Sequence, residues 1–484
     1  MKALMTQHVE RVDLDTLAKN KRINKAIFRA YDIRGQIGTE WCVDGSYDDA
    51  YSIGQAIGGK LVKRGSPDII LGRDGRVSSE LIRESLILGL TSVGCNVTDI
   101  GLTATPVVYF ALTHLNISNS VMVTGSHNPS DHNGIKIVFD ETPITAQVIE
   151  TLYFDIMRDS FDTAKKGKHA LLANINQEYQ EAITNNINLE RPLRIAIDAS
   201  NGATSLFAES LFTQLGCEVY PLFCDLDGTF PNHSPDPTVP DNLSDLITLV
   251  KKEKLDIGIA FDGDGDRMIA VDNKGKILWP DRIMILLAQE VLKKQPSSCI
   301  VFDVKCSYLL PKAINQAGGQ ASMCVSGHSI LKIQMKRLNA AMGGEFSGHI
   351  VMPDRWNNFD DGPYVAARLL EILSNTSQSS AEVFNEIPDS ISTPEYKLHM
   401  DSHEEANDWV EQFIKQAKFS GANLTLIDGL RVDYEDGWGL VRSSNTSACL
   451  GFRFEADSES RLKEIQQQFR EVFDKLENTK TLPF

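Results

Sequence analysis

Strand-like apolar runs alternate with helix-like segments through most of the chain, and the alternation starts afresh twice. The first series contains the strand-like runs Asp68–Gly72, Asn96–Ile100 and Ser120–Val123 and the helix-like segments Asp49–Arg64, Ser79–Val93 and Pro106–Leu115. New strand-like runs begin at Leu193–Asp198 and at Ser298–Asp303. Such alternation is typical of α/β layers. The sequence therefore predicts three related α/β units, each a mixed sheet flanked by helices.

The last part of the chain has a different pattern. After the segment Pro388–Pro394, which we expect to be a linker, strand-like runs are separated only by turns, and a helix-like segment begins at Ser458. This pattern indicates an α+β unit. At 484 residues the chain exceeds the roughly 100–200 residues of a single domain. We expect an N-terminal extension (1–26), three α/β domains (27–172, 173–278 and 279–389) and a C-terminal domain (390–484).

Composition argues against several classes of partner. The formal net charge is −17, whereas binding to nucleic acid or to an anionic membrane requires a broad basic face. Residues 1–25 lack the apolar core of a signal peptide, and no run approaches the roughly 18 apolar residues of a membrane-spanning helix. The eight cysteines include no C-x-x-C pair, which indicates thiols in a reducing compartment. We therefore expect a cytoplasmic protein that binds neither nucleic acid nor membranes.

A polar turn follows the apolar run Ser120–Val123. It reads Thr-Gly-Ser-His-Asn-Pro over residues 124–129 and leads into a second apolar run. Taken alone, it is typical of an ordinary turn between two strands. Two functions are open for Ser126: the nucleophile of an acyl-transfer triad, or a hydroxyl that carries a phosphoryl group. The triad is disfavoured, because no G-x-S-x-G motif surrounds Ser126 and His127 is its direct neighbour.

Three aspartates follow another strand-like run. Asp262, Asp264 and Asp266 are separated by glycines, so their carboxylates can converge on one hard cation, and Mg²⁺ fits such oxygen ligands best. An EF-hand loop is a poor match, because its sixth position is Arg267 and its twelfth is Asn273 instead of glycine and glutamate. Without a cation the three acids repel one another, which favours a metal site over a solvated turn. Arg267 is then a candidate phosphate contact.

A second acidic motif offers an alternative function. Asp225 and Asp227 belong to an Asp-x-Asp-Gly-Thr run after an apolar strand. This run resembles the nucleophile loop of haloacid-dehalogenase-type phosphatases, in which the first aspartate is phosphorylated beside Mg²⁺. Here it leads into the proline-rich residues 231–237, where that fold has a helix and a cap insertion. A phosphatase that uses Asp225 is therefore kept as the disfavoured alternative.

Two further loops carry groups suited to a phosphorylated sugar. Residues 344–349 read Gly-Glu-Phe-Ser-Gly-His, and their carboxylate, hydroxyl and imidazole suit vicinal sugar hydroxyls. Residues 442–447 read Arg-Ser-Ser-Asn-Thr-Ser, and a guanidinium with several hydroxyls and N–H groups can hold a phosphate dianion. Each loop alone is about as consistent with a plain turn. Taken alone, Lys305 and His328 are single charged or titratable positions, which are more typical of surface residues.

In series, Thr-Gly-Ser-His-Asn-Pro, Asp-Gly-Asp-Gly-Asp-Arg and Gly-Glu-x-Ser-Gly-His resemble the α-D-phosphohexomutase superfamily, and within it the bacterial phosphomannomutase/phosphoglucomutase group. The resemblance runs from Phe28 to about Glu455, and residues 228–237 resemble that family's second domain. It implies four domains around a central cleft. Three would be related α/β units, and the C-terminal α+β domain would resemble the TATA-box-binding protein.

The resemblance also implies roles for individual residues. Ser126 is the expected phosphoserine, and its phosphate would bind Mg²⁺ together with Asp262, Asp264 and Asp266. The expected catalytic residues are Ser126, Arg34, His127, Lys136, Arg267 and His349. The expected substrate-binding residues are Tyr31, Lys305, His328, Glu345, Ser347, His349, Arg442, Ser443, Ser444, Asn445 and Thr446.

The reaction implied by the resemblance is reversible conversion of a hexose 1-phosphate into its 6-phosphate, through a phosphoserine enzyme and a 1,6-bisphosphate. We expect mannose and glucose phosphates as substrates, because Phe346 fits that group better than the phosphoglucosamine mutases, where glutamine is usual. A phosphoglucosamine mutase remains an alternative. We also expect Mg²⁺ as cofactor, glucose 1,6-bisphosphate as activator, and a monomer whose partners are small sugar phosphates.

Overall fold

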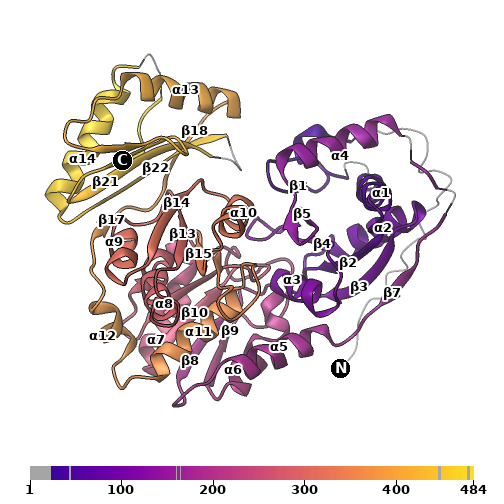
Figure 1. Cartoon of the computed structure of the whole chain (residues 1–484), viewed down its shortest axis with the longest axis horizontal. Coiled ribbons are helices and arrows are strands. Elements are labelled where there is room, and N and C mark those ends of the chain that lie inside the picture. The colour runs from indigo at the N-terminus through magenta and orange to yellow at the C-terminus, as the bar shows by residue number, and fades with distance from the viewer. Residues whose placement is uncertain (1–22, 43–44, 160, 164, 445–447, 477–479) are drawn as a thin grey trace.

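The computed structural model describes residues 23–42, 45–159, 161–163, 165–444, 448–476 and 480–484. These residues form four sheets in succession along the chain (Figure 1). Most of the predicted N-terminal extension lies outside the described residues, which begin with a short 3-10 helix at Lys25–Ile27. No helix within the described ranges is long and apolar enough to cross a membrane.

The first unit is built on a sheet with the strand order β1-β5-β4-β2-β3-β7, in which β6 pairs with β5. Its strands are β1 (Ile33–Gln36), β2 (Asp68–Arg73), β3 (Asn96–Leu102), β4 (Ser120–Val123), β5 (His132–Phe139), β6 (Thr142–Pro143) and β7 (His169–Leu171). Its helices are α1 (Asp48–Lys63), α2 (Ser79–Ser92), α3 (Thr105–His114) and α4 (Ala146–Arg158). Helices α1, α2 and α4 share a core on one face of this sheet, whereas α3 packs toward the second unit (Figure 1).

The second and third units are built on smaller sheets with the orders β12-β11-β10-β8-β9 and β14-β13-β15-β16. The second unit contains α5 (Ile175–Asn186), β8 (Arg194–Asp198), α6 (Ala208–Gln214), β9 (Glu218–Leu222), α7 (Ser244–Glu253), β10 (Ile257–Phe261), β11 (Met268–Asp272) and β12 (Ile277–Leu278). The third contains α8 (Pro280–Lys294), β13 (Cys299–Asp303), α9 (Leu309–Gln316), β14 (Gln320–Cys324), α10 (His328–Leu338), β15 (Met342–Gly344), β16 (Ile350–Val351), α11 (Gly362–Ser374) and α12 (Ser380–Asn385).

The three units share one strand topology. A central strand has a parallel neighbour on each side, and the second of these neighbours continues into an antiparallel strand. The equivalent series are β3-β2-β4-β5, β9-β8-β10-β11 and β14-β13-β15-β16. The prediction of three related α/β units with mixed sheets is therefore confirmed.

The C-terminal unit is an antiparallel sheet with the order β17-β22-β21-β20-β19, in which β18 also pairs with β22. Its elements are β17 (Ile391–Ser392), β18 (Tyr396–His399), α13 (His403–Gln416), β19 (Asn423–Thr425), β20 (Leu430–Asp433), β21 (Gly437–Ser443), β22 (Cys449–Ala456) and α14 (Glu459–Phe473). The predicted α+β arrangement is confirmed. The predicted linker Pro388–Pro394 is partly wrong, because β17 lies within it and pairs with Glu455 and Ala456 of β22.

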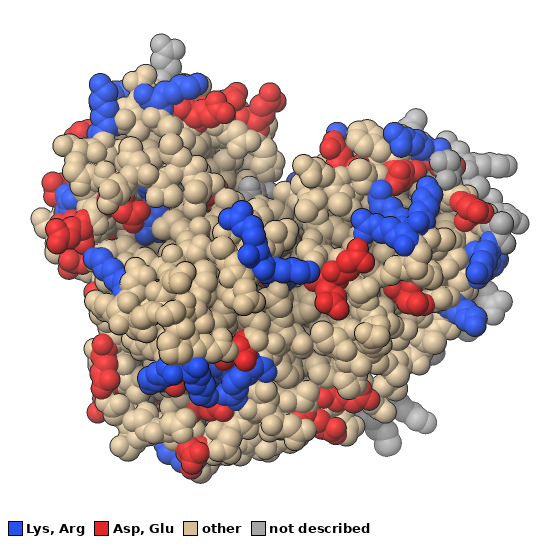
Figure 2. All heavy atoms as spheres, in the orientation of Figure 1, with Lys and Arg blue, Asp and Glu red and all other residues tan. Residues whose placement is uncertain are grey.

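Two features of the packing position the site. One apolar core runs through the second and third units and includes α3 of the first, as in the stacking of Phe110 on Trp356 at 6.0 Å between ring centroids. The C-terminal unit has its own core, in which Phe413 and Phe454 contact Phe469. Figure 2 shows an open cleft between the C-terminal unit and the first unit. The C-terminal unit thus stands apart as one wall of that cleft.

Candidate active site

Three loops in equivalent places carry the three central motifs. The loop between β4 and β5 contains Ser126, the loop between β10 and β11 contains residues 262–267, and the loop between β15 and β16 contains residues 345–349. In each of these three sheets, the central strand has a parallel strand on either side. Each of the three loops joins one of these parallel strands, namely β4, β10 or β15, to the antiparallel strand that follows it. Because the three units face one another through these edges, motifs far apart in sequence meet at one point.

Ser126 is buried and points at the second unit. Only 1% of the Ser126 surface is exposed, and the Ser126 hydroxyl donates to Asp262 Oδ2 at 2.9 Å. The Ser126 N–H donates to Thr124 Oγ1 at 2.8 Å, and Ser126 Oγ lies 3.2 Å from His127 Nδ1. The backbone at Ser126 is left-handed, with φ of 48°. The tight turn therefore aims one hydroxyl at the aspartates.

The aspartate loop forms a compact acidic site. Asp262, Asp264 and Asp266 are each 0% exposed, and one oxygen from each lies within 4.8 Å of the others. The Oδ1 atom of Asp264 is buried without a hydrogen-bond partner, and Asp266 Oδ1 is buried with a long contact of 3.3 Å to His349 Nε2. Burial and the two neighbouring carboxylates raise the pKa of Asp262 well above its usual range. Buried carboxylate oxygens in this arrangement fit a hard cation such as Mg²⁺.

Lys136 places a fixed positive charge in the acidic site. It comes from β5, is 6% exposed, and its ammonium donates to Asp264 Oδ2 at 2.6 Å and also to Asp266. Burial disfavours the charged amine, but the aspartates outweigh burial and raise the pKa of Lys136 well above its usual range. The amine is thus held as an ammonium ion between two candidate metal ligands.

The third loop joins the second through His349. Arg267 and His349 form an antiparallel bridge, and their Nε and Nε2 atoms are 3.2 Å apart. His349 Nδ1 lies 3.0 Å from Glu345 Oε2, and His349 Nε2 lies 3.3 Å from Asp266 Oδ1. Burial and Arg267 disfavour the charged ring, but Asp266 and Glu345 outweigh them and raise the pKa of His349 to about 9. The neighbouring carboxylates therefore favour the protonated form of His349.

A second buried charge cluster supports this histidine. The rings of His328 and His349 stack at 5.1 Å, His328 Nδ1 lies 3.3 Å from Asp360 Oδ2, and the Lys332 ammonium donates to Asp360 Oδ1 at 2.6 Å. Burial and Lys332 lower the pKa of His328. A second group of potential metal ligands consists of Asp266, His328, His349 and Asp360. In this group the Lys332 ammonium already neutralises the Asp360 carboxylate.

Residues of the first unit close the site from the other side. Arg34 donates to Asn128 Oδ1 at 2.9 Å and lies 2.5 Å from Asp32 Oδ2. Burial, Arg267 and Arg34 lower the pKa of His127 well below its usual range, so this ring is neutral. The Tyr31 ring reaches the third unit, where a Cβ atom on Gly327 would lie about 3.0 Å from it. The predicted first-unit residues thus lie next to the Ser126 loop or across the cleft from it.

The predicted phosphate loop lies at the end of β21. Arg442 Nε donates to Asp428 Oδ2 at 3.0 Å, and the same oxygen accepts from the Ser326 N–H of the third unit at 3.1 Å. The Ser444 N–H donates to the Cys449 carbonyl at 2.9 Å. The remaining predicted substrate-binding residues of this loop, Asn445 and Thr446, lie outside the described residues. Arg442 is therefore linked to the third unit through one carboxylate.

Lys305 and Ser347 line the same region. Lys305 Nζ lies 3.7 Å from Glu395 Oε2. Burial disfavours its charge, but Glu395 and Asp303 outweigh burial and raise its pKa. Ser347 Oγ lies 3.1 Å from His349 Nδ1. Sequence reasoning missed Lys332, Asp360 and Asp428. The available signals were that Asp360 lies just before the start of α11 and that Asp428 precedes the turn residue Gly429, whereas nothing in the sequence marked Lys332.

Comparison with known proteins places this geometry in a family. Residues 25–162, 177–275 and 279–391 match the phosphoglucomutase/phosphomannomutase alpha/beta/alpha domains I, II and III, and residues 400–472 match the C-terminal domain of the same family. The phosphomannomutase/phosphoglucomutase of Pseudomonas putida is 46% identical over 95% of this chain and 98% of that protein. The chain belongs to the phosphoglucomutase/phosphomannomutase family.

Other members show the same extent of similarity. The phosphoglucomutase of Neisseria meningitidis serogroup A is 44% identical over 93% of this chain and 97% of that protein. A phosphoglucomutase/phosphomannomutase family protein of Burkholderia thailandensis, solved by X-ray crystallography, superposes with a TM-score of 0.90 at 41% identity, covering 96% of this chain and 100% of that one. The predicted family, fold class and enzyme class, a phosphohexomutase, are therefore confirmed.

Family membership also decides between the functions left open by the sequence. The comparisons support a phosphohexomutase of the phosphomannomutase/phosphoglucomutase kind, and neither a haloacid-dehalogenase phosphatase nor a phosphoglucosamine mutase. The structure explains the misleading motif. The exposed Asp227 carboxylate accepts from the Thr229 N–H at 2.9 Å. Neither Asp225 nor Asp227 belongs to a group of potential metal ligands among the described residues.

Proposed function

We propose that the chain interconverts the 1-phosphate and 6-phosphate of mannose and of glucose, with Ser126 carrying the transferred phosphoryl group. The observation that carries the proposal is the 2.9 Å hydrogen bond from the buried Ser126 hydroxyl to Asp262, inside a cluster of carboxylates that has an unpaired oxygen. The phosphoryl group moves from Ser126 to the free hydroxyl of the substrate. The resulting 1,6-bisphosphate turns end for end, and its other phosphoryl group returns to Ser126.

The charges around Ser126 have distinct parts in this cycle. Asp262, Asp264 and Asp266, with the phosphate on Ser126, would hold Mg²⁺, which when bound neutralises charge on the phosphoryl group. Lys136 and Arg267 add fixed positive charge beside the same group. In the forward transfer the attacking substrate hydroxyl loses a proton and Ser126 Oγ gains one; a cleft base accepts the first proton and protonated His349 supplies the second, and the two roles reverse in the return transfer. Arg34 and Lys136 support the same proton movement, and His127 flanks the reacting oxygen.

Sugar and distal phosphate are bound by the third and C-terminal units. Glu345 and Ser347 contact hydroxyls that both orientations of the sugar present, because the two orientations must bind almost equally. The phosphate that does not react is held by Arg442 and the loop that follows it, residues 443–446. We expect Lys305, His328 and Tyr31 to complete the lining of the cleft.

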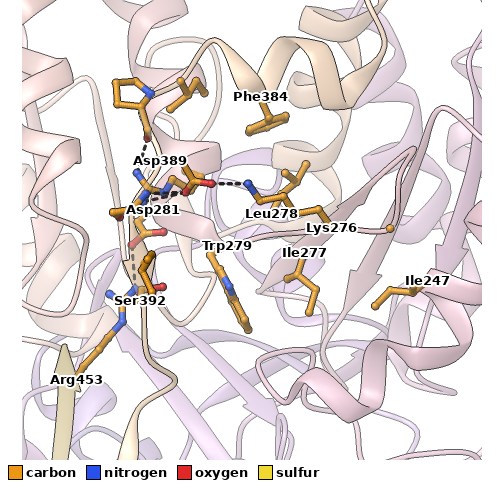
Figure 3. A pocket seen from close by; sticks show the side chains of 16 residues that line it. Ile247, Lys276, Ile277, Leu278, Trp279, Asp281, Phe384, Asp389, Ser392 and Arg453 are labelled. Carbon is orange, nitrogen blue, oxygen red and sulfur yellow. Dashed lines mark hydrogen bonds and ion pairs between the residues drawn. The ribbon is translucent and has the colours of Figure 1, made fainter. Parts of the chain in front are cut away.

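Turning of the intermediate requires the cleft to open, and the joint before the C-terminal unit allows it. A cavity of about 500 Å³ lies beside residues 387–392. Figure 3 shows its lining, with Lys276 joined to Asp389 and Arg453 directed toward Asp281. In hinge motions, a few residues between domains absorb the change in backbone dihedral angles. Identical interdomain geometry in the free and substrate-bound protein would contradict this motion.

Three further expectations belong to the proposal. We expect domain boundaries near residues 172, 278 and 389, an expectation that the succession of the four sheets supports. Glucose 1,6-bisphosphate would act as activator by restoring the phosphate on Ser126. The protein would be cytoplasmic. It would also be a monomer, because residues from all four units of one chain line the proposed site. Light scattering during gel filtration measures the oligomeric state, and activity of dephosphorylated enzyme with and without the bisphosphate tests the activator.

Peptide mass spectrometry and a coupled assay test the central proposal. The Ser126 peptide of the purified protein should carry a phosphate, and mannose 1-phosphate and glucose 1-phosphate should turn over, with glucosamine 1-phosphate as the comparison substrate. Ser126→Ala should abolish both the phosphopeptide and turnover. Ser130→Ala is the matched control, since Ser130 is exposed in the same loop. A fully active Ser126→Ala variant would remove Ser126 from the mechanism.

A further inference from the structure

One buried arginine holds most of the Ser126 loop by its backbone. Arg76 is 2% exposed, and its guanidinium donates to four carbonyls of the loop. The acceptors are the carbonyl oxygens of Ser126 at 2.6 Å, Asn128 at 2.7 Å, Pro129 at 2.5 Å and His132 at 3.0 Å. A guanidinium presents several donors in a rigid plane. One side chain therefore sets the path of the whole turn.

The orientation of Arg76 is itself fixed by Asp74. The Arg76 Nε atom donates to Asp74 Oδ2 at 3.2 Å, and the Arg76 N–H donates to Asp74 Oδ1 at 3.0 Å. Thr124 and Ser79 donate their hydroxyls to the two oxygens of the same carboxylate. Asp74 also donates its N–H to the Val123 carbonyl at 2.9 Å. Both ends of the arginine are thus tied to the first unit.

The second unit covers the guanidinium with the loop that resembles a phosphatase motif. The Phe230 ring centroid lies 4.9 Å from the Arg76 guanidinium carbon. At Gly228, a Cβ atom would lie 2.3 Å from the Gly75 carbonyl oxygen and 2.6 Å from Arg76 Cα, so only glycine fits there. Residues 228–230 of the second unit therefore pack against Arg76 of the first unit.

Arg76 with its supports Asp74 and Phe230, here called the clamp, also sets the direction of the His127 N–H. In a planar trans peptide, the C=O of one residue and the N–H of the next point in opposite directions. Because the Ser126 carbonyl points at Arg76, the His127 N–H points away from it. Within the described residues, this N–H donates to no backbone carbonyl. The left-handed φ of 48° at Ser126 is a conformation that a serine keeps only when its surroundings enforce it.

We propose that Arg76, held by Asp74 and capped by Phe230, is a positioning residue that fixes the Ser126 loop so that the His127 N–H is presented to the phosphoryl group on Ser126. The proposal rests on the proposed function of Ser126. It also assigns a use to the Asp225–Phe230 motif, because the clamp is complete only when the second unit packs on the first.

Two variants and a matched control test the clamp. Arg76→Lys keeps the charge but cannot donate to four carbonyls, and Phe230→Leu removes the ring while keeping an apolar cover. Arg83→Lys is the control, because Arg83 pairs with Asp99 in the same unit, away from the loop. Measured quantities are kcat, KM for glucose 1-phosphate, thermal midpoint, and the rate at which water removes phosphate from Ser126.

In Arg76→Lys we expect kcat to fall about 100-fold, the loss typical of reacting groups misplaced by about 1 Å. We expect KM to change less than about threefold and hydrolysis of the phosphoserine to accelerate, relative to Arg83→Lys. Phe230→Leu should change the same quantities in the same direction by a smaller factor. If Arg76→Lys fails to fold, Phe230→Leu alone decides the test.

Two outcomes separate this inference from the proposed function. If Ser126→Ala is inactive but Arg76→Lys and Phe230→Leu match Arg83→Lys in kcat and in phosphoserine hydrolysis at equal thermal stability, the clamp is overturned while the mutase function stands. If Ser126→Ala retains activity, the proposed function fails and the clamp fails with it.

Discussion

The Lys136 ammonium lies 2.6 Å from Asp264 Oδ2 and also contacts Asp266. This places a permanent positive charge against two of the three carboxylates that would hold Mg²⁺. The carboxylates of a buried metal site repel one another when the metal leaves. We therefore expect Lys136 to offset this repulsion when the ion is absent.

Lys136→Met should make the protein depend on Mg²⁺ for stability. Removing one partner of a buried ion pair costs about 3–5 kcal/mol, and Met keeps most of the side-chain volume. The thermal midpoint in EDTA should fall by several degrees, and Mg²⁺ should restore more of it than in the wild type. Calorimetry with and without Mg²⁺ measures this. Lys60→Met is the control, since Lys60 pairs with Asp155 nearer the surface; equal metal dependence in both variants would contradict the expectation.

Arg442→Gln should weaken substrate binding more than it slows chemistry. The guanidinium is 5% exposed and is directed by Asp428, and a hydrogen bond to a charged group contributes about 1.5–3 kcal/mol. KM for hexose phosphates should rise about 10- to 100-fold, with a smaller change in kcat. Steady-state kinetics measures the two constants separately. Arg461→Gln, which alters a surface pair with Asp436, should change neither; a kcat effect as large as the KM effect would place Arg442 in the chemical step.

Glu345→Gln should shift the pH dependence of turnover. Glu345 and Asp266 raise the pKa of His349 to about 9, so the protonated ring is present below that pH and is lost as pH rises through it. Removing the negative charge of Glu345 lowers this pKa, and the alkaline limb of kcat should move to lower pH. Profiles from about pH 6 to about pH 10 at saturating Mg²⁺ measure the shift. An alkaline limb that stays in place would show that it does not report His349.

Arg453→Met should loosen the joint between the third and C-terminal units. Arg453 is 1% exposed, donates to the Lys305 carbonyl, and lies 3.5 Å from the Phe346 ring centroid. Arg431 donates to the neighbouring carbonyls of Val304 and Cys306 at 2.6 and 2.7 Å. Two buried arginines of the C-terminal unit thus hold three consecutive carbonyls at Lys305.

Loss of Arg453 leaves a buried carbonyl without its donor, which costs about 1–3 kcal/mol. We expect a lower thermal midpoint, and a higher KM because Lys305 and Phe346 lose a shared support. Calorimetry and steady-state kinetics measure both. Arg470→Met is the control, because Arg470 packs on Phe484 within the C-terminal unit alone. Unchanged KM in Arg453→Met would separate the joint from substrate binding.

The strand and helix pattern predicted the layers closely, because burial on sheet faces imposes the apolar runs that the sequence displays. The elements β4, β8 and α2 begin and end within one residue of their predicted limits. The linker prediction was wrong at β17, because Ile391 and Ser392 extend the C-terminal sheet by pairing with Glu455 and Ala456. That pairing depends on a strand far along the chain, which a local pattern does not reveal.

By itself, the sequence determined the chemistry of each loop. The Ser126 turn, the three aspartates and the Glu345–His349 loop are each contiguous, so the order of residues alone displays their functional groups and their places after apolar strands. The roles assigned to these residues stay predictions. Family membership, which the motifs also indicated, was confirmed by comparison.

Only the tertiary structure decided how the loops act on one another. The shared strand order places the three loops at equivalent edges, and packing of those edges brings Lys136 to Asp264 and His349 to Asp266. Within the first sheet, pairing of β2 with β4 brings Arg76 to the carbonyls of the Ser126 turn. Arg76 and Ser126 are 50 residues apart, and Lys136 and Asp264 are 128 apart. Their pairing follows from burial, since a charge removed from water must find its partner among whatever residues the fold packs beside it.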